Sequence, residues 1–353
     1  MKRLALVMLA ACGGAPAAPL VERAPGGLAP IDPGTSSASL LSAAACAGCH
    51  PGQHAEWAAS RHAAAWTNGI FRREYRDFPR EWCVRCHAPL TPQVAQVRRG
   101  GGGPLADEGV GCASCHVRGG RIVAREQRRG SPHQTLARAD FGGPATCAGC
   151  HQFEFPMFDR DGEVRRLSAF PMQSTVAQFH AGPLRDTEGG CRGCHALTPY
   201  GHRYPGAHDP AMLERALSLE VCRDGDELVM SVENRGAGHH VPTGDVHRHV
   251  NLRAWRSVAP ERLTEIFFGR RFEPMAEGGK RTVWDSTLAP RQRRSFRVAP
   301  GDLGDEGPVR FELVYVYTAD ERPRPGRDPG EPTSRLIAER SARFEELPAC
   351  GSH

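Results

Sequence analysis

The sequence lacks any apolar run long enough to cross a lipid bilayer. The run from Leu4 to Ala11 has eight residues, whereas a membrane-spanning helix needs about 20. We therefore expect no membrane-spanning helix. Two basic residues, Lys2 and Arg3, followed by a short apolar run are instead typical of a secretory signal.

A cysteine follows this apolar run directly. The segment Leu9-Ala10-Ala11-Cys12 resembles the lipobox of bacterial lipoproteins, in which the cysteine is acylated and becomes the mature N-terminus. The resemblance implies that residues 1–12 are a lipoprotein signal with a lipidated Cys12, and Gly13 favours the outer membrane. The alternative is an ordinary signal peptide, with Cys12 discarded after cleavage.

The next two segments have little or no strand-like alternation of polar and apolar residues. Residues 13–44 are rich in Ala, Pro, Gly and Ser and are predicted to form a flexible tether. Residues 45–210 contain short helical patterns with many Gly and Pro. A segment with so little regular structure needs an additional source of apolar contacts for its core.

Residues 211–350 have a different pattern. Alternating strands are predicted at 227–232, 249–255, 309–317 and 334–346, after a short helix near 210–217. Short strands separated by Gly, Pro and Asp turns favour an antiparallel, immunoglobulin-like β-sandwich of about seven strands. The expected fold class is α+β, with a helical N-terminal region and a β-sandwich after it.

The motif Cys-x-x-Cys-His occurs five times between residues 45 and 210. The copies are Cys46, Cys49 and His50; Cys83, Cys86 and His87; Cys112, Cys115 and His116; Cys147, Cys150 and His151; and Cys191, Cys194 and His195. Two thiols at this spacing form thioethers to the two vinyl groups of a haem, and the adjacent histidine binds its iron. One copy would also suit a zinc site or a redox dithiol, but five copies ending in His predict five covalent c-type haems. Residues 45–210 are therefore predicted to be a pentahaem cytochrome c domain.

Lysine is almost absent, since only Lys280 follows the signal. A lysine-ligated catalytic haem is therefore not expected. The formal charge of +5 falls to +3 without Lys2 and Arg3. Five haems, each with two propionates and one net positive charge on oxidised iron, bring this to about −2. The basic composition therefore gives no reason to expect nucleic-acid binding.

The second axial ligand of each iron decides its chemistry. A second histidine favours electron transfer, whereas an open position favours substrate binding. We expect the distal ligands to be His62, His133, His180, His202 and His239. Met172 or an open position is the alternative to His180, and His240 competes with His239. A histidine on the surface or bonded to a propionate is the alternative for each.

Two stretches carry a family resemblance over about residues 45–200. Trp57-Ala58-Ala59-Ser60-Arg61-His62 and Glu108-Gly109-Val110-Gly111-Cys112 resemble the tetrahaem electron carriers of nitrifying bacteria, which are related to hydroxylamine oxidoreductase. The resemblance implies that His62 reaches the iron of a neighbouring haem. The fifth motif and the C-terminal domain depart from the tetrahaem pattern. The partner and substrate of that family therefore cannot be assigned to this chain.

A second resemblance covers residues 202–250. The segments 201–206 and 234–244 are similar to parts of multihaem cytochromes with a β-rich C-terminal domain. This similarity and the Gly-rich turn at His239 lead us to expect His202 and His239 as ligands from outside the motif region. The domain 211–350 would then be docked onto the haems.

Cys222 and Cys350 remain, one near each end of the expected β-sandwich. In an oxidising compartment a disulfide between them is the simplest interpretation, and two free thiols are the alternative.

These patterns predict an exported electron carrier at the periplasmic or outer surface of a Gram-negative outer membrane. Its expected partners are other redox proteins, such as cytochromes or a membrane quinol oxidase. An enzyme with one open haem that acts on nitrogen or sulfur oxyanions is the alternative, because the family contains both kinds. A third hypothesis makes the β-sandwich a docking module in a larger complex.

Overall fold

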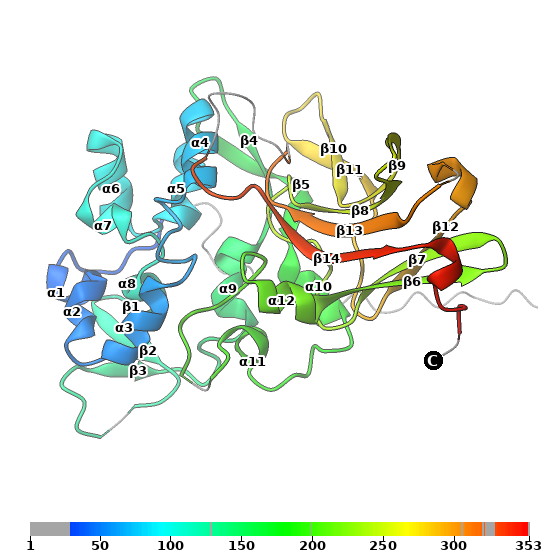
Figure 1. The fold of residues 1–353 in the computed structure, drawn as a ribbon. Coiled ribbons are helices and arrows are strands. Elements are labelled where there is room, and N and C mark those ends of the chain that lie inside the picture. Colours follow the sequence, from blue (N-terminus) through cyan, green and yellow to red (C-terminus); the bar gives the residue numbers. More distant parts are fainter. Residues whose placement is uncertain are drawn as a thin grey trace, which may run out of the picture.

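The computed structural model of the chain describes residues 29–351, except 128, 199, 305, 320 and 322–328. Short helices make up the N-terminal part, and antiparallel sheets make up most of the C-terminal part (Figure 1). The predicted α+β class is confirmed at this level. Among the described residues, no helix is long and apolar enough to cross a membrane. Cys12 lies outside the described residues.

The helices are short, and the longest among the described residues has 10 residues. Asn68 caps one helix by accepting a hydrogen bond from the Phe71 N–H, and proline opens several others. The helices are α1 (Ala38–Leu41), α2 (Ala43–Ala47), α3 (Pro51–Ala58), α4 (Gly69–Asp77), α5 (Glu81–His87), α6 (Thr91–Gly100), α7 (Pro104–Asp107), α8 (Cys112–His116), α9 (Pro144–His151), α10 (Thr175–Ala181), α11 (Cys191–His195) and α12 (Pro210–Ala216).

Strands also occur within residues 45–210, where the sequence pattern predicts almost none. A small sheet has the order β1-β2-β3, and β4 pairs with β5 in an antiparallel hairpin. Their bounds are β1 (Val117–Arg118), β2 (Arg121–Ala124), β3 (Thr135–Ala137), β4 (Gln152–Phe158) and β5 (Val164–Ser174). Strand β4 buries three consecutive residues, so it does not alternate in the way that a half-exposed strand does.

Two antiparallel sheets follow, with strand orders β12-β7-β6 and β14-β13-β8-β9. Their strands are β6 (Leu217–Asp224), β7 (Glu227–Asn234), β8 (His249–Arg256), β9 (Ala259–Phe268), β12 (Arg293–Val298), β13 (Val309–Val316) and β14 (Ser334–Ala342). A separate hairpin joins β10 (Arg270–Pro274) and β11 (Lys280–Asp285). The four strands and the helix that the sequence predicts correspond to β7, β8, β13, β14 and α12.

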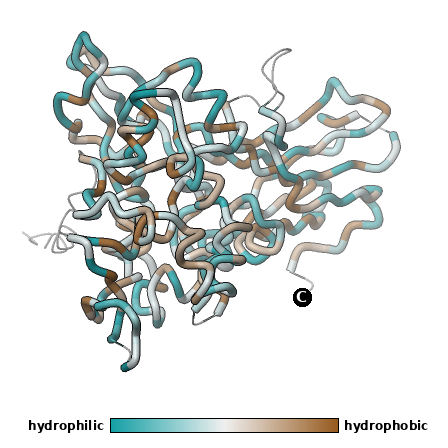
Figure 2. The backbone as a smooth tube through the Cα atoms, turned by 90° about the vertical axis from the view of Figure 1, so that its left-hand side faces the viewer, coloured by the Kyte–Doolittle hydropathy of each residue, from teal (hydrophilic) through white to brown (hydrophobic). Residues whose placement is uncertain are grey.

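Both sheets contribute to one hydrophobic core. Leu219 and Met230 from the first sheet belong to the same buried cluster as Leu252, Phe268 and Phe311 from the second. Strand β6 shows why the sheets form, because Leu217, Leu219 and Val221 are buried while the residues between them are not. Figure 2 shows apolar residues in short segments spread along the chain rather than in one long run.

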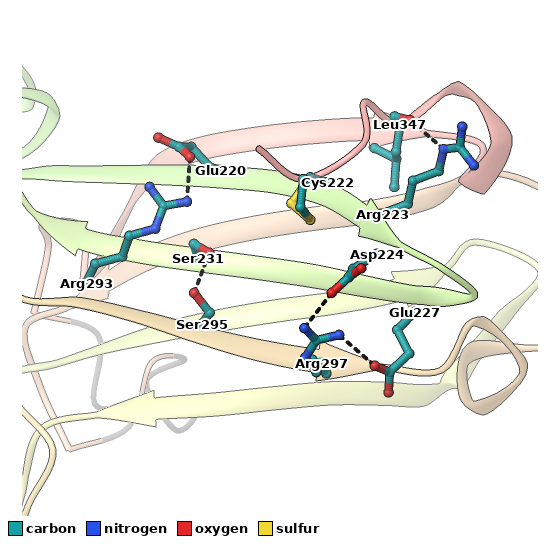
Figure 3. Close-up of a disulfide and its surroundings, with 11 residues drawn as sticks. Glu220, Cys222, Arg223, Asp224, Glu227, Ser231, Arg293, Ser295, Arg297 and Leu347 are labelled. Atoms are coloured by element: carbon teal, nitrogen blue, oxygen red, sulfur yellow. Dashed lines mark hydrogen bonds and ion pairs between the residues drawn. A yellow bond between two sulfur atoms is a disulfide. The ribbon is translucent and has the colours of Figure 1, made fainter. Parts of the chain in front are cut away.

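A disulfide joins Cys222 on β6 to Cys350 near the C-terminus, across 128 residues (Figure 3). The expected disulfide is therefore present. Beside it, Arg297 of β12 pairs with Asp224 and Glu227 at 2.6 and 2.8 Å. These side chains are about half exposed, so the ion pairs add little stability.

Residues 29–44 differ from the flexible tether that the sequence predicts. Ile31 pairs with Leu90 as a parallel bridge, and the Ile31 N–H donates to the Pro89 carbonyl at 2.8 Å. Leu41 and Ala43 are buried. Apolar side chains within this segment thus hold it against the N-terminal part of the body.

Candidate multihaem site

The five attachment motifs lie on short helical segments. Four of the motifs end at the last residue of α5, α8, α9 or α11, and the first begins near the end of α2 and ends at His50, the residue before α3. Residues three and four apart lie on one face of a helix, so each motif presents two thiols and an imidazole on the same side. All ten motif cysteines are free of disulfides. We number these sites 1 to 5 in chain order.

Backbone carbonyls orient several of the imidazoles. A carbonyl oxygen can only accept, so Nδ1 carries the proton and Nε2 is left free for a metal. The bonds run from His87 to Ala65 (2.7 Å), His116 to Val123 (2.9 Å), His195 to Pro205 (2.7 Å), His202 to Tyr200 (2.7 Å) and His239 to His240 (2.9 Å). These contacts fix the neutral tautomer that binds iron.

Four motif histidines face a second histidine from elsewhere in the chain. The ring centroids are 6.4 Å apart for His50 and His133, 6.4 Å for His151 and His62, 6.1 Å for His116 and His202, and 6.3 Å for His195 and His239. Two imidazoles bound to opposite sides of one metal through bonds of about 2 Å have centroids about 6.4 Å apart. The four separations therefore leave room for one iron between each pair.

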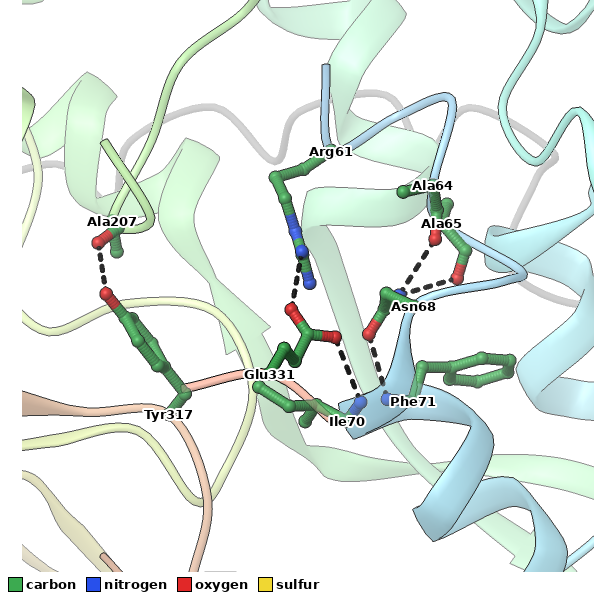
Figure 4. A network of polar contacts seen from close by, with 9 residues as sticks. All are labelled: Arg61, Ala64, Ala65, Asn68, Ile70, Phe71, Ala207, Tyr317 and Glu331. Carbon is green, nitrogen blue, oxygen red and sulfur yellow. Dashed lines mark hydrogen bonds and ion pairs between the residues drawn. The ribbon is translucent and has the colours of Figure 1, made fainter. Parts of the chain in front are cut away.

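Site 2 is different. Among the described residues, no histidine ring lies opposite His87 at the separation of the other four pairs. Phe71 of α4 stacks on the face of His87 instead, at 3.7 Å between centroids and 10° between planes. The N-terminus of α4 is held by Asn68 and by Glu331, which accepts from the Ile70 N–H at 3.1 Å (Figure 4).

The structure therefore brings four of the five expected distal histidines to a motif histidine. His180 of α10 is the exception, and its ring neighbour is Phe179 at 5.7 Å. His240 bonds Thr287 at 2.9 Å, while His208 stacks on Tyr317 at 4.0 Å. Iron ligation itself remains a prediction for every one of these residues.

The two stretches that carry the first resemblance contact each other directly. The Trp57 Nε1–H donates to the Val110 carbonyl, and the Val110 N–H donates to the His62 carbonyl, both at 2.9 Å. Gly109 has a φ of 59°, and a Cβ there would lie 2.6 Å from the His62 carbonyl oxygen. Glycine is thus required for this approach, which holds His62 opposite His151.

Contacts between thiols of different motifs give the order of the sites in space. The Cys46 thiol contacts Cys112, the Cys86 thiol contacts Cys150, and the Cys147 thiol contacts Cys191. Sites 1 and 3, 2 and 4, and 4 and 5 are therefore neighbours.

The connection between sites 3 and 4 comes from two further observations. Cys115 and Cys150 interact electrostatically, and the Tyr204 ring lies beside both His202 and His62. The five sites thus form one connected, branched group, in which site 4 is next to sites 2, 3 and 5.

One connected cavity of about 2570 Å³ is lined by every motif cysteine and histidine. Divided among five sites it gives about 500 Å³ each, within the range of about 300–1,000 Å³ that is typical of ligand pockets. The chain thus leaves a shared interior space, with thiols and imidazoles on its walls, that fits covalently bound porphyrins.

Burial favours the neutral form of several of these imidazoles. It lowers the pKa of His151 to about 3, with help from nearby His62, and lowers the pKa of His239 to about 4. Burial also lowers the pKa of His62 and of His116. A neutral imidazole is the form that binds a metal, so this environment favours ligation.

Sequence reasoning missed two contributors to the site. Phe71 has no signal in the sequence, because nothing local shows that α4 packs on His87. The Pro205 carbonyl lies in segment 201–206, where the sequence indicates side chains such as His202 and Tyr204 but no role for the backbone.

Comparisons with known proteins agree with this geometry. Residues 45–117 match the family described as cytochrome c554 and c-prime. The fold is similar to the crystal structure of a penta-heme cytochrome c552 from Thermochromatium tepidum, with a TM-score of 0.60 and 19% identity over 88% of this chain and 99% of that chain. No curated protein sequence matches the chain. Taken with the attachment motifs and the shared cavity, these matches identify the chain as a multihaem c-type cytochrome, in which residues 45–117 are similar to the cytochrome c554 and c-prime family.

Proposed function

We propose that the chain holds five haems through its ten motif cysteines and passes electrons along them between redox partners. The observation that carries this proposal is the set of four facing imidazole pairs, 6.1–6.4 Å apart, on sites that form one connected group. The likeness in fold to a protein described as penta-heme supports the number five.

Under this proposal two facing histidines would hold each of four irons, namely His50 with His133, His116 with His202, His151 with His62, and His195 with His239, and His87 would hold the iron at site 2. Bound haems supply one-electron redox chemistry. The protein's part is to saturate four irons with two imidazoles each, which suits electron transfer rather than substrate binding. Neutral, buried imidazoles held by backbone carbonyls keep this ligation fixed.

The test is a haem count combined with a redox titration of the purified full-length protein. Intact-mass measurement should give five covalent haems, and spectroelectrochemical titration should take up five electrons per chain. Four or fewer haems in the mature protein, or electron uptake confined to one haem, would overturn the proposal.

A second function is favoured by site 2, where no histidine of the described part of the chain faces His87 at the separation of the other pairs. An iron held there by His87 alone would have an open position for a small ligand, and the substrates we propose are nitrogen or sulfur oxyanions. Carbon monoxide should bind the reduced protein at one haem per chain. Binding at no haem would exclude this function and leave the electron carrier unaffected.

We also propose an exported protein, anchored to the outer membrane by a lipid on Cys12, that faces the periplasm or the cell surface. Other cytochromes or a membrane quinol oxidase are the proposed partners, and no nucleic acid is involved. Membrane fractions should retain the wild-type protein and lose a Cys12→Ala variant into the soluble fraction. Equal partitioning of the two proteins would contradict the anchor.

For the C-terminal region we propose an immunoglobulin-like sandwich. Two antiparallel sheets of three and four strands around one core support this assignment, as does the position of β7 and β13 in the middle of their sheets. A crystal structure of the full chain tests it through the packing angle of the two sheets, which should be near 30°. Sheets packed at right angles would contradict it.

A further inference from the structure

Segment 201–206, which follows the last attachment motif, contacts three of the five sites. His202 faces His116 of site 3 at 6.1 Å, and the Pro205 carbonyl accepts from Nδ1 of His195 at site 5 at 2.7 Å. Tyr204 lies between these two residues in sequence. Its ring is 5.6 Å from the ring of His62, which faces His151 at site 4.

The Tyr204 ring touches the distal imidazoles of two different sites. Its centroid lies 5.6 Å from that of His62 with 60° between planes, and 6.2 Å from that of His202 with 78° between planes. Aromatic rings interact favourably at centroid separations of about 4.5–7 Å when tilted or edge to face. One side chain thus contacts both imidazoles at once and limits the rotation of each.

The backbone at Tyr204 takes an uncommon conformation to place this ring. Its φ is 44°, in the left-handed region that bulky residues rarely adopt. Tyr204 also precedes Pro205, and a residue before proline favours an extended conformation. Residues in such rare backbone conformations occur where the surrounding structure imposes the conformation, and they are frequent at functional sites.

The hydroxyl end of Tyr204 is fixed as well. The ring is mostly buried, and its hydroxyl hydrogen-bonds Arg192, which lies within the attachment motif of site 5. Tyr204 is therefore held at both ends, by imidazoles of sites 3 and 4 and by the motif of site 5.

We infer that Tyr204 is a positioning residue that fixes the planes of the distal imidazoles His62 and His202. This inference rests on the proposed ligation of sites 3 and 4. The planes of the two facing rings differ by 64° at site 4 and by 24° at site 3, and Tyr204 keeps these angles distinct. Axial imidazole orientation is one of the properties that a protein uses to tune haem iron, and the g-values of a low-spin ferric haem report it.

The experiment compares electron paramagnetic resonance spectra of the oxidised, five-haem protein. The variants are Tyr204→Leu, which removes the ring, and Tyr204→Phe, which keeps the ring and loses only the hydroxyl. Phe170→Leu is the control, because it removes an aromatic ring at a residue that is 38% exposed and does not line the cavity.

Tyr204→Leu should shift the g-values of two low-spin signals and leave the other signals in place. Tyr204→Phe and Phe170→Leu should keep the wild-type spectrum. Where Tyr204→Leu fails to mature with five haems, Tyr204→Met is the second variant, because its flexible side chain fills the same space.

Three results would overturn the inference. These are an unchanged spectrum after removal of the ring, equal shifts in the Leu and Phe variants, or changes in every signal at once. The readout uses resting protein without a partner. Failure of the electron-transfer proposal would appear separately, as a wrong haem count or incomplete reduction.

Discussion

The His239 imidazole lies 6.3 Å from the His195 imidazole, and the two ring planes differ by only 8°. His195 belongs to the last attachment motif, whereas His239 follows β7 of the C-terminal part. The loop that carries His239 is anchored by Asn234, whose buried amide donates to the His239 carbonyl at 2.9 Å and to Leu288 at 3.0 Å. A residue of the β-rich half is therefore in place to complete site 5.

Replacing His239 should open site 5 alone. In His239→Ala one low-spin haem should become high-spin in the oxidised protein, and carbon monoxide binding to the reduced protein should rise by one equivalent. His240→Ala is the control, because His240 bonds Thr287 rather than facing a motif histidine. Unchanged spin states in His239→Ala, or equal changes in both variants, would contradict this assignment.

Glu331 connects the C-terminal part to α4, and its removal should destabilise the protein. Glu331 pairs with Arg61 at 2.7 Å and accepts from the Ile70 N–H at 3.1 Å (Figure 4). Glu331→Ala leaves a helix N-terminus without this acceptor, so unfolding free energy should fall by about 1–2 kcal/mol.

Guanidinium unfolding followed by circular dichroism measures this loss, with the exposed Glu345→Ala as control. Because Phe71 of α4 stacks on His87, the absorption of the haem at site 2 should shift as well. Equal midpoints in the two variants would count against the connection.

The Cys222–Cys350 disulfide closes a loop of 128 residues that includes both sheets of the C-terminal part. Loops of this length restrict the unfolded chain strongly, so Cys222→Ser/Cys350→Ser should lose about 2–5 kcal/mol. The native haem spectrum should not change, since neither cysteine belongs to an attachment motif. Guanidinium unfolding of the variant, compared with that of the wild type without reductant, tests this, and an unchanged midpoint would contradict it.

His208 should make the folded protein sensitive to acid. Burial, with nearby Arg61, Arg248 and Arg335, lowers its pKa to about 3. Between pH 6.5 and 3 the unfolded chain therefore binds a proton that the folded chain does not, and stability falls as the pH falls. At pH 5 the loss is about 2 kcal/mol.

His208→Phe keeps a ring to stack on Tyr317 but removes the titrating group. As the pH is lowered from 7 to 5, the wild type should therefore lose more unfolding free energy than the variant. Parallel stability curves across this range would show that His208 contributes no pH dependence.

The attachment motifs can be read from the sequence because thioether formation requires two thiols and an imidazole within five consecutive residues. A distal ligand needs no such proximity, since His239 follows His195 by 44 residues. Sequence patterns can therefore only identify candidate distal histidines. His180 illustrates the limit, because it stands on α10 beside two buried residues, Val176 and Phe179, and faces no motif histidine.

In the fold, too, some elements can be predicted from local sequence and others depend on tertiary contacts. Strands β7, β8 and β13 bury many apolar residues, so their pattern predicts them. Strand β11 buries none of its residues, and its pairing with β10 depends on contacts that no local pattern shows. Ile31 and Leu41 sit in a segment whose composition resembles a linker, and only tertiary packing gives it structure.

The most direct test of the four facing pairs is a count of spin states in the oxidised wild-type protein. Mössbauer spectroscopy of iron-57-labelled protein detects every haem, including any haem whose electron paramagnetic resonance signal is altered by a neighbouring haem. The proposed ligation predicts four low-spin haems and one high-spin haem, at site 2. Fewer than four low-spin haems would contradict it.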